Sequence, residues 1–335
     1  MPTISDVARA AGVSMSTVSY VLSGRRPISA ETSARVRAAI AELGYHPHAG
    51  ARALASSRTS VLALVVPLRA DVNVPVIMQF VTAVVTAARR YNHDVLLLTK
   101  DEGTAGLERV AGATMVDALL VMDVESDDVR IPALGRLKQP SVLIGLPDDP
   151  GGIACVDLDF AATARECLDH LAGHGHRRIA LVGPSPAVYE RGTTYAGRFL
   201  AGFDAASAEL GLETVTHSCE PGPAGVRDCL AWIDTELPGA TALVVHNEEA
   251  LLPLLEELRA RGRKIPEELS VVAVCPRDVA TALPVHLTSA DIPAHDVGTL
   301  AVETAMNLLA GRRAPGTRLL PPTIIERDSC AAPPA

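Results

Sequence analysis

Aromatic side chains are scarce in this sequence: Phe, Tyr and Trp together make up 3% of its 335 residues, and there is one Trp. Lysine is rarer still, with Lys100, Lys138 and Lys264 alone, so arginine supplies most of the positive charge. No apolar run reaches the roughly 18 residues that a membrane span needs, and we expect no membrane contact. The hydrophobic fraction of 48% must therefore build a globular core mainly from Ala, Val and Leu.

Several motifs of catalysis are also absent. The sequence has no G-x-x-x-x-G-K-[ST] phosphate loop, no G-x-S-x-G elbow and no H-E-x-x-H zinc motif. Its cysteines include no C-x-x-C pair, and the first residues, MPTISDVARAAG, lack an apolar signal core, so we expect free thiols and a cytoplasmic protein. We interpret Cys155 and the pair His174 and His176 as structural, and we expect no enzyme, no cofactor and no metal site.

Charge is distributed unevenly along the chain. The whole sequence has a net charge of −9, yet residues 1–60 hold seven arginines against three acids, a balance of +4. The other 275 residues hold 23 basic and 36 acidic residues, a balance of −13. A short basic segment could meet the phosphates of a nucleic acid, which the acidic remainder would repel. A solvated, arginine-rich helical cap is the alternative.

The basic segment shows the pattern of three short helices. Apolar residues recur at helical spacing in three runs, each followed by a glycine: 4–11, 14–22 and 29–43. A tight turn after the first run predicts a helix-turn-helix, whose second helix places its N-terminal residues in the major groove. We expect the core to receive Val18, Val21 and Leu22. The side chains of the second helix that have no place in this core would then face DNA: Met15, Ser16 and Tyr20. A plain three-helix bundle is the alternative.

Three pieces of residues 3–56 carry a more specific signal: DVARAAGVSMSTVSYVL, ISAETSARVRAAIAELGYHP and AGARALA. They closely resemble the headpiece of the lactose-repressor (LacI/GalR) family of bacterial transcription regulators. The resemblance implies an N-terminal all-α helix-turn-helix headpiece followed by an α/β, two-lobed effector domain similar to periplasmic binding proteins. It also implies that Met15, Ser16 and Tyr20 read base edges, although Met15 could instead pack on the edge of the domain. The hydroxyls implied to hold phosphates are those of Ser14, Thr17, Ser19 and Ser23.

Residues 47–59 correspond to the family's hinge and linker. In the family this segment folds as a helix on the operator and pairs with its dimer mate in the minor groove. The resemblance places Ala51 and Leu54 at the DNA, with Leu54 as an apolar wedge that unstacks a base step. Leu54 could instead dock on the neighbouring domain, and Gly50 would weaken a helix here.

Beyond residue 60, near-continuous apolar runs alternate with amphipathic stretches, which is typical of parallel strands covered by helices. We expect three parts: a DNA-binding headpiece over 1–46, the linker over 47–59 and an effector-binding and dimerisation domain over 60–335. The resemblance divides the last part into two lobes, about 60–159 with 290–320 and 160–289 with 321–330. Ligands of such folds lie at the carboxyl ends of the strands.

The resemblance also suggests which residues line the cleft between the lobes. The candidates for effector binding are Arg69, Asp71, Asn73, Asp159, Arg198, Asn247 and Asp278. Carboxylates and amides would bind sugar hydroxyls, whereas the arginines would suit a charged or acidic ligand. Each of these residues could also be an ordinary solvated loop residue.

The sequence thus predicts a homodimeric regulator, expected to be a repressor, that binds a pseudo-palindromic, double-stranded operator. A small-molecule effector, a sugar or related metabolite, would modulate its DNA affinity from the interlobe cleft. Two other interpretations stay open. One is a small-molecule-binding protein whose headpiece has lost its DNA function, and the other is an α/β enzyme with an appended regulatory headpiece.

Overall fold

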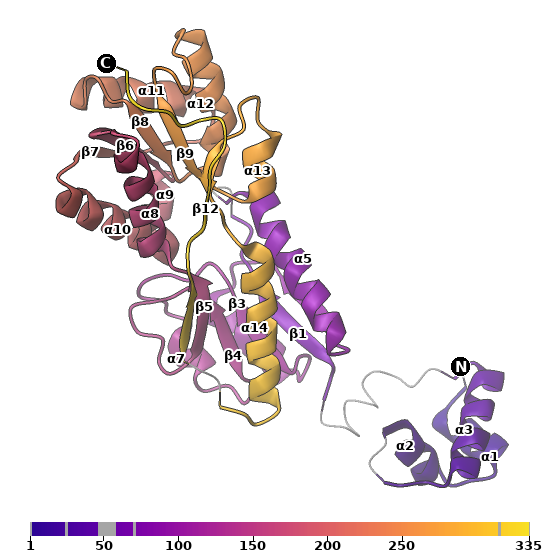
Figure 1. The fold of residues 1–335 in the computed structure, drawn as a ribbon. Helices are drawn as coiled ribbons and strands as arrows, with labels where there is room; N and C mark the ends of the chain where they lie inside the picture. Colours follow the sequence, from indigo (N-terminus) through magenta and orange to yellow (C-terminus); the bar gives the residue numbers. More distant parts are fainter. Residues whose placement is uncertain (1, 24–25, 46–57, 70–71, 314–315, 335) are drawn as a thin grey trace.

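A computed structural model describes residues 2–23, 26–45, 58–69, 72–313 and 316–334. It contains a unit of three helices and two six-stranded sheets that are covered by helices (Figure 1). The predicted architecture, a helix-turn-helix headpiece and a two-lobed α/β body, is confirmed. Across the described segments, each helix falls short of the length or the apolar character needed to cross a membrane.

The headpiece consists of three helices: α1 (Ile4–Ala11), α2 (Met15–Ser23) and α3 (Ala30–Leu43). Thr3 accepts a hydrogen bond from the backbone N–H of Asp6, whose carboxylate accepts one from the N–H of Thr3, and this reciprocal cap begins α1. Gly12 ends α1 with a φ of 62°, a left-handed conformation that costs glycine little. The core between the helices is formed by Val7, Ala8, Ala11, Val18, Val36, Ala39 and Tyr45.

One expectation about this core is wrong. Leu22 is 39% exposed, because it lies one helical turn beyond the fully buried Val18 and past the apolar cluster. Val21 is partly buried against the cluster. The turn after α1 is held from α3, where Arg35 Nη2 donates hydrogen bonds to the backbone carbonyls of Ala11 and Gly12.

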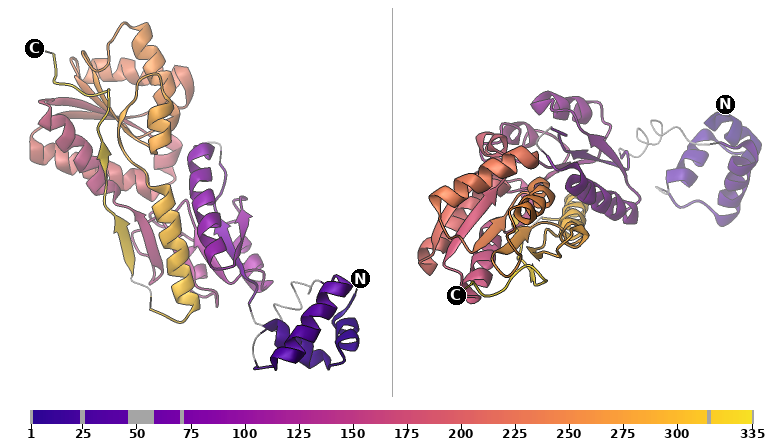
Figure 2. Two further views of the ribbon diagram at one scale, coloured as in Figure 1. Left: turned by 45° about the vertical axis from the view of Figure 1, so that its right-hand side comes forward. Right: turned by 90° about the horizontal axis from the view of Figure 1, so that it is seen from above.

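The first sheet has the strand order β11-β5-β4-β3-β1-β2, and all its strands are parallel. Leu62 and Leu64 of β1 belong to the apolar layer under α5 and α14, which lie side by side (Figure 2). Ala63 belongs to the opposite layer, under α6 and α7, as the two-residue period of a strand requires. We call this unit the N-lobe. Its elements are β1 (Val61–Val65), α5 (Val74–Arg90), β2 (Asp94–Leu98), α6 (Gly103–Gly112), β3 (Ala118–Val121), α7 (Ile131–Leu134), β4 (Ser141–Ile144), β5 (Ala154–Leu158), α14 (Ala294–Leu309) and β11 (Thr317–Leu320).

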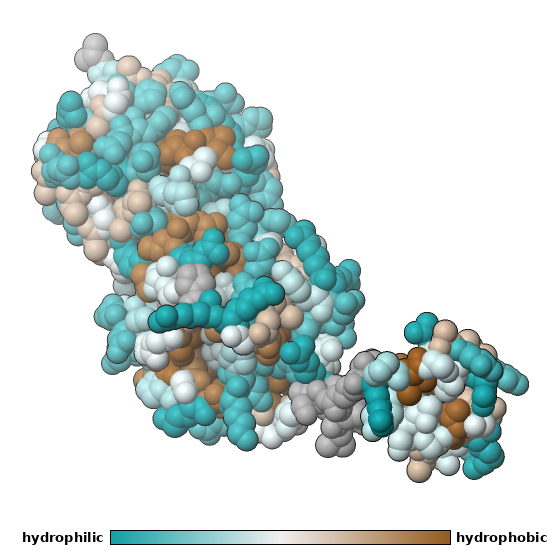
Figure 3. Space-filling view, turned by 60° about the horizontal axis from the view of Figure 1, so that its bottom comes forward, coloured by the Kyte–Doolittle hydropathy of each residue, from teal (hydrophilic) through white to brown (hydrophobic). Residues whose placement is uncertain are grey.

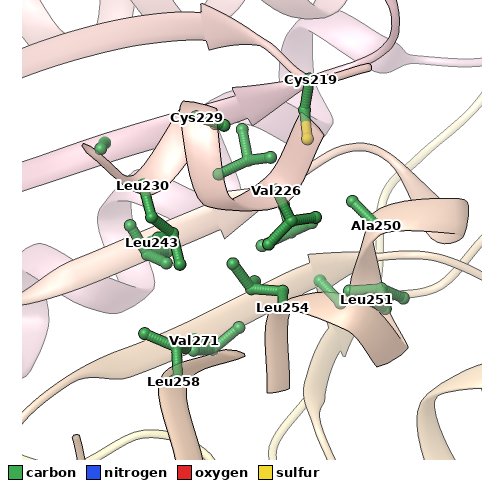
Figure 4. Close-up of a cluster of buried hydrophobic side chains, with 14 of the residues drawn as sticks. Cys219, Val226, Cys229, Leu230, Leu243, Ala250, Leu251, Leu254, Leu258 and Val271 are labelled. Carbon is green, nitrogen blue, oxygen red and sulfur yellow. The ribbon is translucent and has the colours of Figure 1, made fainter. Parts of the chain in front are cut away.

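The second sheet, in the C-lobe, has the order β12-β10-β9-β8-β6-β7, with β12 antiparallel to β10. One face packs on α8 and α10, and the other packs on α11 and α12, whose apolar side chains Figure 4 shows between the helices and the sheet. The elements of this lobe are α8 (Phe160–Gly173), β6 (Arg178–Gly183), α9 (Pro186–Glu190), α10 (Thr194–Leu210), β7 (Glu213–Ser218), α11 (Gly222–Glu236), β8 (Ala242–Val245), α12 (Glu248–Ala260), β9 (Ser270–Val274), α13 (Arg277–Ala282), β10 (Thr288–Ala290) and β12 (Ile324–Ile325).

The chain passes between the two lobes three times: between β5 and α8, between β10 and α14, and between β11 and β12. The lobes also touch through side chains and backbone. Gln79 Nε2 donates to both carboxylate oxygens of Asp278 at 3.1 Å, and the N–H of Thr194 donates to the carbonyl of Val124 at 3.0 Å. The space between the lobes is therefore bounded on more than one side.

Candidate functional site

The exposed side of α2 is the candidate surface for DNA. Met15 is 54% exposed, Ser16 is exposed, and Ser19 and Tyr20 are half-buried. The first two lie in the N-terminal turn of the helix, which carries no acidic residue. Figure 3 shows small apolar areas on the headpiece surrounded by hydrophilic atoms. The helix thus presents uncharged side chains of differing chemistry to solvent, which suits contact with base edges.

Two of the predicted phosphate-binding hydroxyls help to form α2. The Ser14 Oγ accepts a hydrogen bond from the N–H of Thr17 at 3.1 Å and lies 2.9 Å from the Thr17 Oγ1. Ser14 therefore caps the helix, as Ser commonly does. Both hydroxyls lie at the N-terminal end, where backbone N–H groups and the helix dipole favour an anion such as a phosphate.

An arginine lies beside the predicted base readers. The Arg26 guanidinium carbon is 5.9 Å from the centre of the Tyr20 ring, within the range of a cation–π contact. Arg26 is exposed, so the pair can present a positive group next to the α2 surface. The remaining headpiece predictions lie outside the described residues: the positions of Ala51 and Leu54, and the side chain of Ser23.

The second candidate site is a pocket between the lobes. The N-lobe contributes residues that follow β3, including Asp123, and the start of α5; the C-lobe contributes Phe160 of α8 and His246, which follows β8. Ligands of open α/β sheets bind at this edge, the carboxyl end of the strands. The residues that line the pocket are largely apolar. They include three aromatic side chains, although aromatic residues are scarce in this chain: Phe80, Phe160 and Tyr195.

Two buried polar side chains, His246 and Asp157, and the partly buried Glu248 are set into these apolar walls. His246 is 3% exposed, and the centre of its ring lies 4.3 Å from the centre of the Phe199 ring. Burial lowers the pKa of its imidazole to about 3, so the imidazole is neutral at physiological pH. Burial raises the pKa of Glu248 to about 7. Burial also raises the pKa of Asp157 to about 7, although Arg198 opposes the shift from 2.8 Å. Hydrogen-bonding groups with little water around them favour a ligand with matching polar groups.

The structure brings some of the predicted effector-binding residues to this pocket. Asn73 lines it and also caps α5, accepting a hydrogen bond from the N–H of Val76 at 3.1 Å. Asn247 lines an adjoining recess that shares Asn73, Tyr195 and Glu248 with the main pocket. Its side chain caps α12 and donates to the carbonyls of Gly183 and Cys219, so it is held in place from both sides.

Other predicted residues stand behind the lining or away from it. Arg69 pairs with Asp101, Asp123 and Glu125, and of these Asp123 lines the pocket. Asp159 caps α8 and lies 3.8 Å from Arg198, which holds Asp157. Asp278 lies in a separate recess near α13 and the start of α14, where it accepts from Gln79 of the N-lobe. Asp71 lies outside the described residues.

Several lining residues were not among those that the sequence predicted: Asp123, Asp157, Arg191, His246 and Glu248. Asp123 and His246 follow apolar runs closely, so a search for polar residues at the ends of predicted strands would have found them. Arg191 lies between α9 and α10, where no periodic pattern marks it. It reaches within 3.7 Å of Asp123, from the opposite lobe.

Cys155 and His176, two residues whose type could suggest chemistry, are buried in the body. Burial raises the pKa of the Cys155 thiol to about 11, so the thiol is protonated and a poor nucleophile at neutral pH. His176 is 1% exposed, and its nitrogens lie 2.8 Å from Thr241 Oγ1 and 2.9 Å from Ser270 Oγ. In the part of the chain that the structure describes, no group of three or more His, Cys, Asp or Glu side chains could hold a metal ion.

Comparisons with known proteins match both parts of the molecule. Residues 3–48 match the family model described as bacterial regulatory proteins, lacI family, and residues 168–330 match a periplasmic binding protein-like domain. The HTH-type transcriptional regulator CelR of Thermobifida fusca is 30% identical over 339 residues, which cover 95% of each chain.

Solved structures with the same fold include a lac repressor dimer bound to operator and an anti-inducer, which is 23% identical over 99% of each chain with a TM-score of 0.84. A complex of the regulator CelR with cellobiose is 26% identical over 98% of this chain and 100% of that one, with a TM-score of 0.69. The headpiece match and the identity with a regulator along nearly the whole length lead to one conclusion: the chain belongs to the lacI family of bacterial regulatory proteins.

Proposed function

We propose that the protein is a repressor that binds a pseudo-palindromic operator as a homodimer and responds to a small molecule bound between its lobes. In this proposal residues 1–46 bind DNA, 47–59 form the hinge and linker, and 60–335 bind the effector and dimerise. It works in the cytoplasm, where its operator lies, and performs no catalysis. The observation that carries the proposal is the exposed, uncharged N-terminal turn of α2, with Met15 at 54% exposure on a folded helix-turn-helix unit.

The chemistry of that turn suits direct reading of DNA. Met15 offers apolar contact, for example to a thymine methyl, and Ser16 can donate to or accept from a base edge. Tyr20, with Arg26 beside it, can hydrogen-bond or stack. The hydroxyls of Ser14 and Thr17 lie at the helix N-terminus, where a phosphate would fix the register of the helix on the duplex.

Dimerisation is supported by an apolar surface around the start of α5. Val74 and Met78, one helical turn apart on α5, are each 42% exposed, and exposed apolar residues that lie next to each other are typical of an interaction surface. Two copies related by a two-fold axis would present two headpieces, and this symmetry requires two half-sites in inverted orientation. The lac repressor of similar fold is a dimer on its operator.

The pocket favours a neutral, polyhydroxy ligand such as a sugar. Flat apolar walls can cover the C–H face of a sugar ring, and carboxyl and imidazole groups can bind its hydroxyls. The arginines near the pocket face carboxylates, Arg191 toward Asp123 and Arg198 toward Asp157, so they leave little free positive charge for an acidic ligand. A sugar is also the ligand in the CelR–cellobiose complex, which has the same fold.

The effector would act by changing how the two lobes sit together. A ligand that touches both lobes stabilises one arrangement of them over another, and the operator does the same from the headpiece side. The effector must then change the affinity for the operator by the same factor by which the operator changes the affinity for the effector.

The experiment that tests the DNA-reading surface compares variants on a duplex selected by the wild-type protein from random sequence. Met15→Ala and Tyr20→Ala should each weaken binding to the selected duplex by about 1–3 kcal/mol and leave binding to unrelated DNA unchanged. The control is Arg37→Ala, at an exposed residue of α3, which removes a charge and should weaken both kinds of binding alike. Equal losses on selected and unrelated DNA for all three variants would contradict the assignment of α2.

The effector is sought with a thermal-shift screen of sugars, nucleosides and phosphorylated metabolites, repeated with the selected duplex. A ligand that stabilises the free protein should shift the apparent affinity for the duplex, and the duplex should shift the ligand affinity by the same factor. A ligand that binds the cleft without changing DNA affinity would contradict the proposed regulation.

A further inference from the structure

The chain enters the N-lobe at Thr59 and Ser60, and these two residues are bound by a single carboxylate. The N–H and the hydroxyl of Thr59 both donate to Asp117 Oδ1, at 2.7 and 2.9 Å. The N–H of Ser60 donates to Asp117 Oδ2 at 2.9 Å. Asp117 thus accepts three hydrogen bonds from two consecutive residues, the last of the linker and the first of the effector-binding domain.

The carboxylate of Asp117 is buried in the N-lobe. The Asp117 side chain is 6% exposed, and His93, which is 8% exposed, covers it with Nε2 at 3.4 Å from Oδ2. A buried carboxylate is costly unless hydrogen-bond donors surround it, and here most of those donors come from the entering chain. The contact therefore holds that chain, since without it the carboxylate would lose its partners.

The backbone around the entering residues is fixed as well. Ser60 has a φ of 56°, an uncommon conformation for a residue with a Cβ, and its carbonyl accepts a hydrogen bond from the N–H of Asp94 at 2.9 Å. The N–H of Asp117 donates to the carbonyl of Val61 at 2.7 Å. Because β1 lies between β2 and β3 in the sheet, these bonds tie the start of β1 to both neighbours.

The strand that follows this carboxylate, β3, leads to the effector pocket. Asp117 directly precedes β3, and Met122 and Asp123, which directly follow it, line the pocket. A four-residue strand in the middle of a sheet is a rigid element, so the position of the entering chain is fixed relative to the pocket walls.

From this arrangement we infer that Asp117 is a positioning residue for operator binding. It fixes residues 59–60 to the N-lobe, so that the linker leaves the body from one defined point at the far end of β3 from the pocket. Without it, two further residues would have to be ordered when the headpieces bind, and this would lower specific affinity. The inference rests on the proposed operator binding.

The test compares two asparagine variants of the full-length protein. Asp117→Asn replaces one accepting oxygen by an amide that faces the N–H of Ser60 or the donors of Thr59. The control is Asp128→Asn, which removes the charge of another buried carboxylate of the same lobe; Asp128 pairs with Arg130 at 2.6 Å and is remote from the linker in sequence, so this is the more disruptive of the two substitutions for the lobe. Binding is measured on a duplex selected by the wild-type protein, and limited trypsin digestion follows cleavage after Arg58.

Two results are expected. Trypsin should cleave the Arg58–Thr59 bond about tenfold faster in Asp117→Asn than in the wild type or the control, because the N of that bond donates to Asp117. Affinity for the selected duplex should fall about tenfold in Asp117→Asn alone. The asparagine keeps one accepting oxygen and so releases about one of the two residues, and ordering one backbone residue changes an equilibrium by about this factor. If Asp117→Asn does not fold, Thr59→Val removes the hydroxyl bond instead and should change both readouts in the same direction.

Unchanged cleavage after Arg58 in both Asp117→Asn and Thr59→Val would overturn the anchor. Faster cleavage with operator affinity equal to that of the control would overturn its role in DNA binding. If the wild-type protein selects no duplex at all, the proposed operator binding fails, and the inference that depends on it fails too, whereas the digestion still reports separately whether Asp117 holds the linker.

Discussion

Replacing Arg35 by alanine should weaken the headpiece and leave the body intact. Its Nη2 donates hydrogen bonds to the carbonyl oxygens of Ala11 and Gly12, at 2.5 and 3.2 Å. Hydrogen bonds from a charged donor contribute about 1.5–3 kcal/mol, and these carbonyls can partly turn to water, so we take roughly 2 kcal/mol for the pair. At about 0.1 kcal/mol per residue, a unit of this size is stable by roughly 4 kcal/mol. The substitution should remove about half of that stability.

The assay is hydrogen exchange of peptides from α1 and α3, measured in the full-length protein. The matched control is Arg37→Ala, which removes the same charge from an exposed position of α3 that makes no side-chain hydrogen bond to another described residue. The free energy of opening should fall by about 2 kcal/mol in Arg35→Ala alone. The headpiece should also unfold at a temperature at least about 10 °C lower.

Operator binding provides a second readout of the same effect. Both variants lose one positive charge, so their affinities should match in the cold, where the Arg35→Ala headpiece is still folded. As the temperature rises, Arg35→Ala should lose its affinity for the operator at a lower temperature than Arg37→Ala. Equal exchange rates in the two variants, or faster exchange in the body, would refute the argument that Arg35 holds the helix-turn-helix.

Two further predictions concern the body. A Cβ at Gly202 of α10 would lie 2.5 Å from the carbonyl oxygen and 2.6 Å from the Cα of Ala161, so Gly202→Ala should destabilise the C-lobe by about 1–3 kcal/mol in denaturant unfolding. The control is Gly197→Ala on the same helix, whose Cβ meets open space and should not lower the stability. Equal stabilities of the two variants would contradict the close approach of α10 and α8. Burial raises the pKa of Glu248 from 4.5 to about 7, so the folded body keeps a proton that the unfolded chain releases, and its stability should fall as the pH rises from 4.5 to about 7 and then level off. Glu248→Gln should flatten that part of the pH profile, and an unchanged slope would show that Glu248 is not its source.

The helices of the headpiece could be predicted closely because their ends are set by local chemistry. Thr3 and Ser29 accept hydrogen bonds from the first turns of α1 and α3, and Gly12 and Gly44 end these helices in the left-handed conformation. Leu22 could not be placed in the same way, because its exposure depends on where the neighbouring helices end and not on its spacing from Val18.

The pocket was harder to predict, because it is assembled from two lobes. Asn73 and Asn247 lie where a turn meets a helix, a position that the sequence pattern indicates. Arg191 reaches the pocket because the fold brings the loop after α9 toward Asp123 of the N-lobe, a contact between residues far apart in sequence. Arg198 does not line the pocket but pairs at 2.8 Å with Asp157, which does, and this pairing depends on the fold and not on the local sequence.

The most direct test of the central claim is a nuclease footprint of the full-length protein on a selected duplex, repeated over a range of salt concentrations. We predict protection of two half-sites in inverted orientation, with an affinity that falls steeply as salt rises, because basic side chains replace counterions on the phosphates. Protection of a single unpaired site, or binding that salt does not weaken, would contradict a paired headpiece that grips DNA.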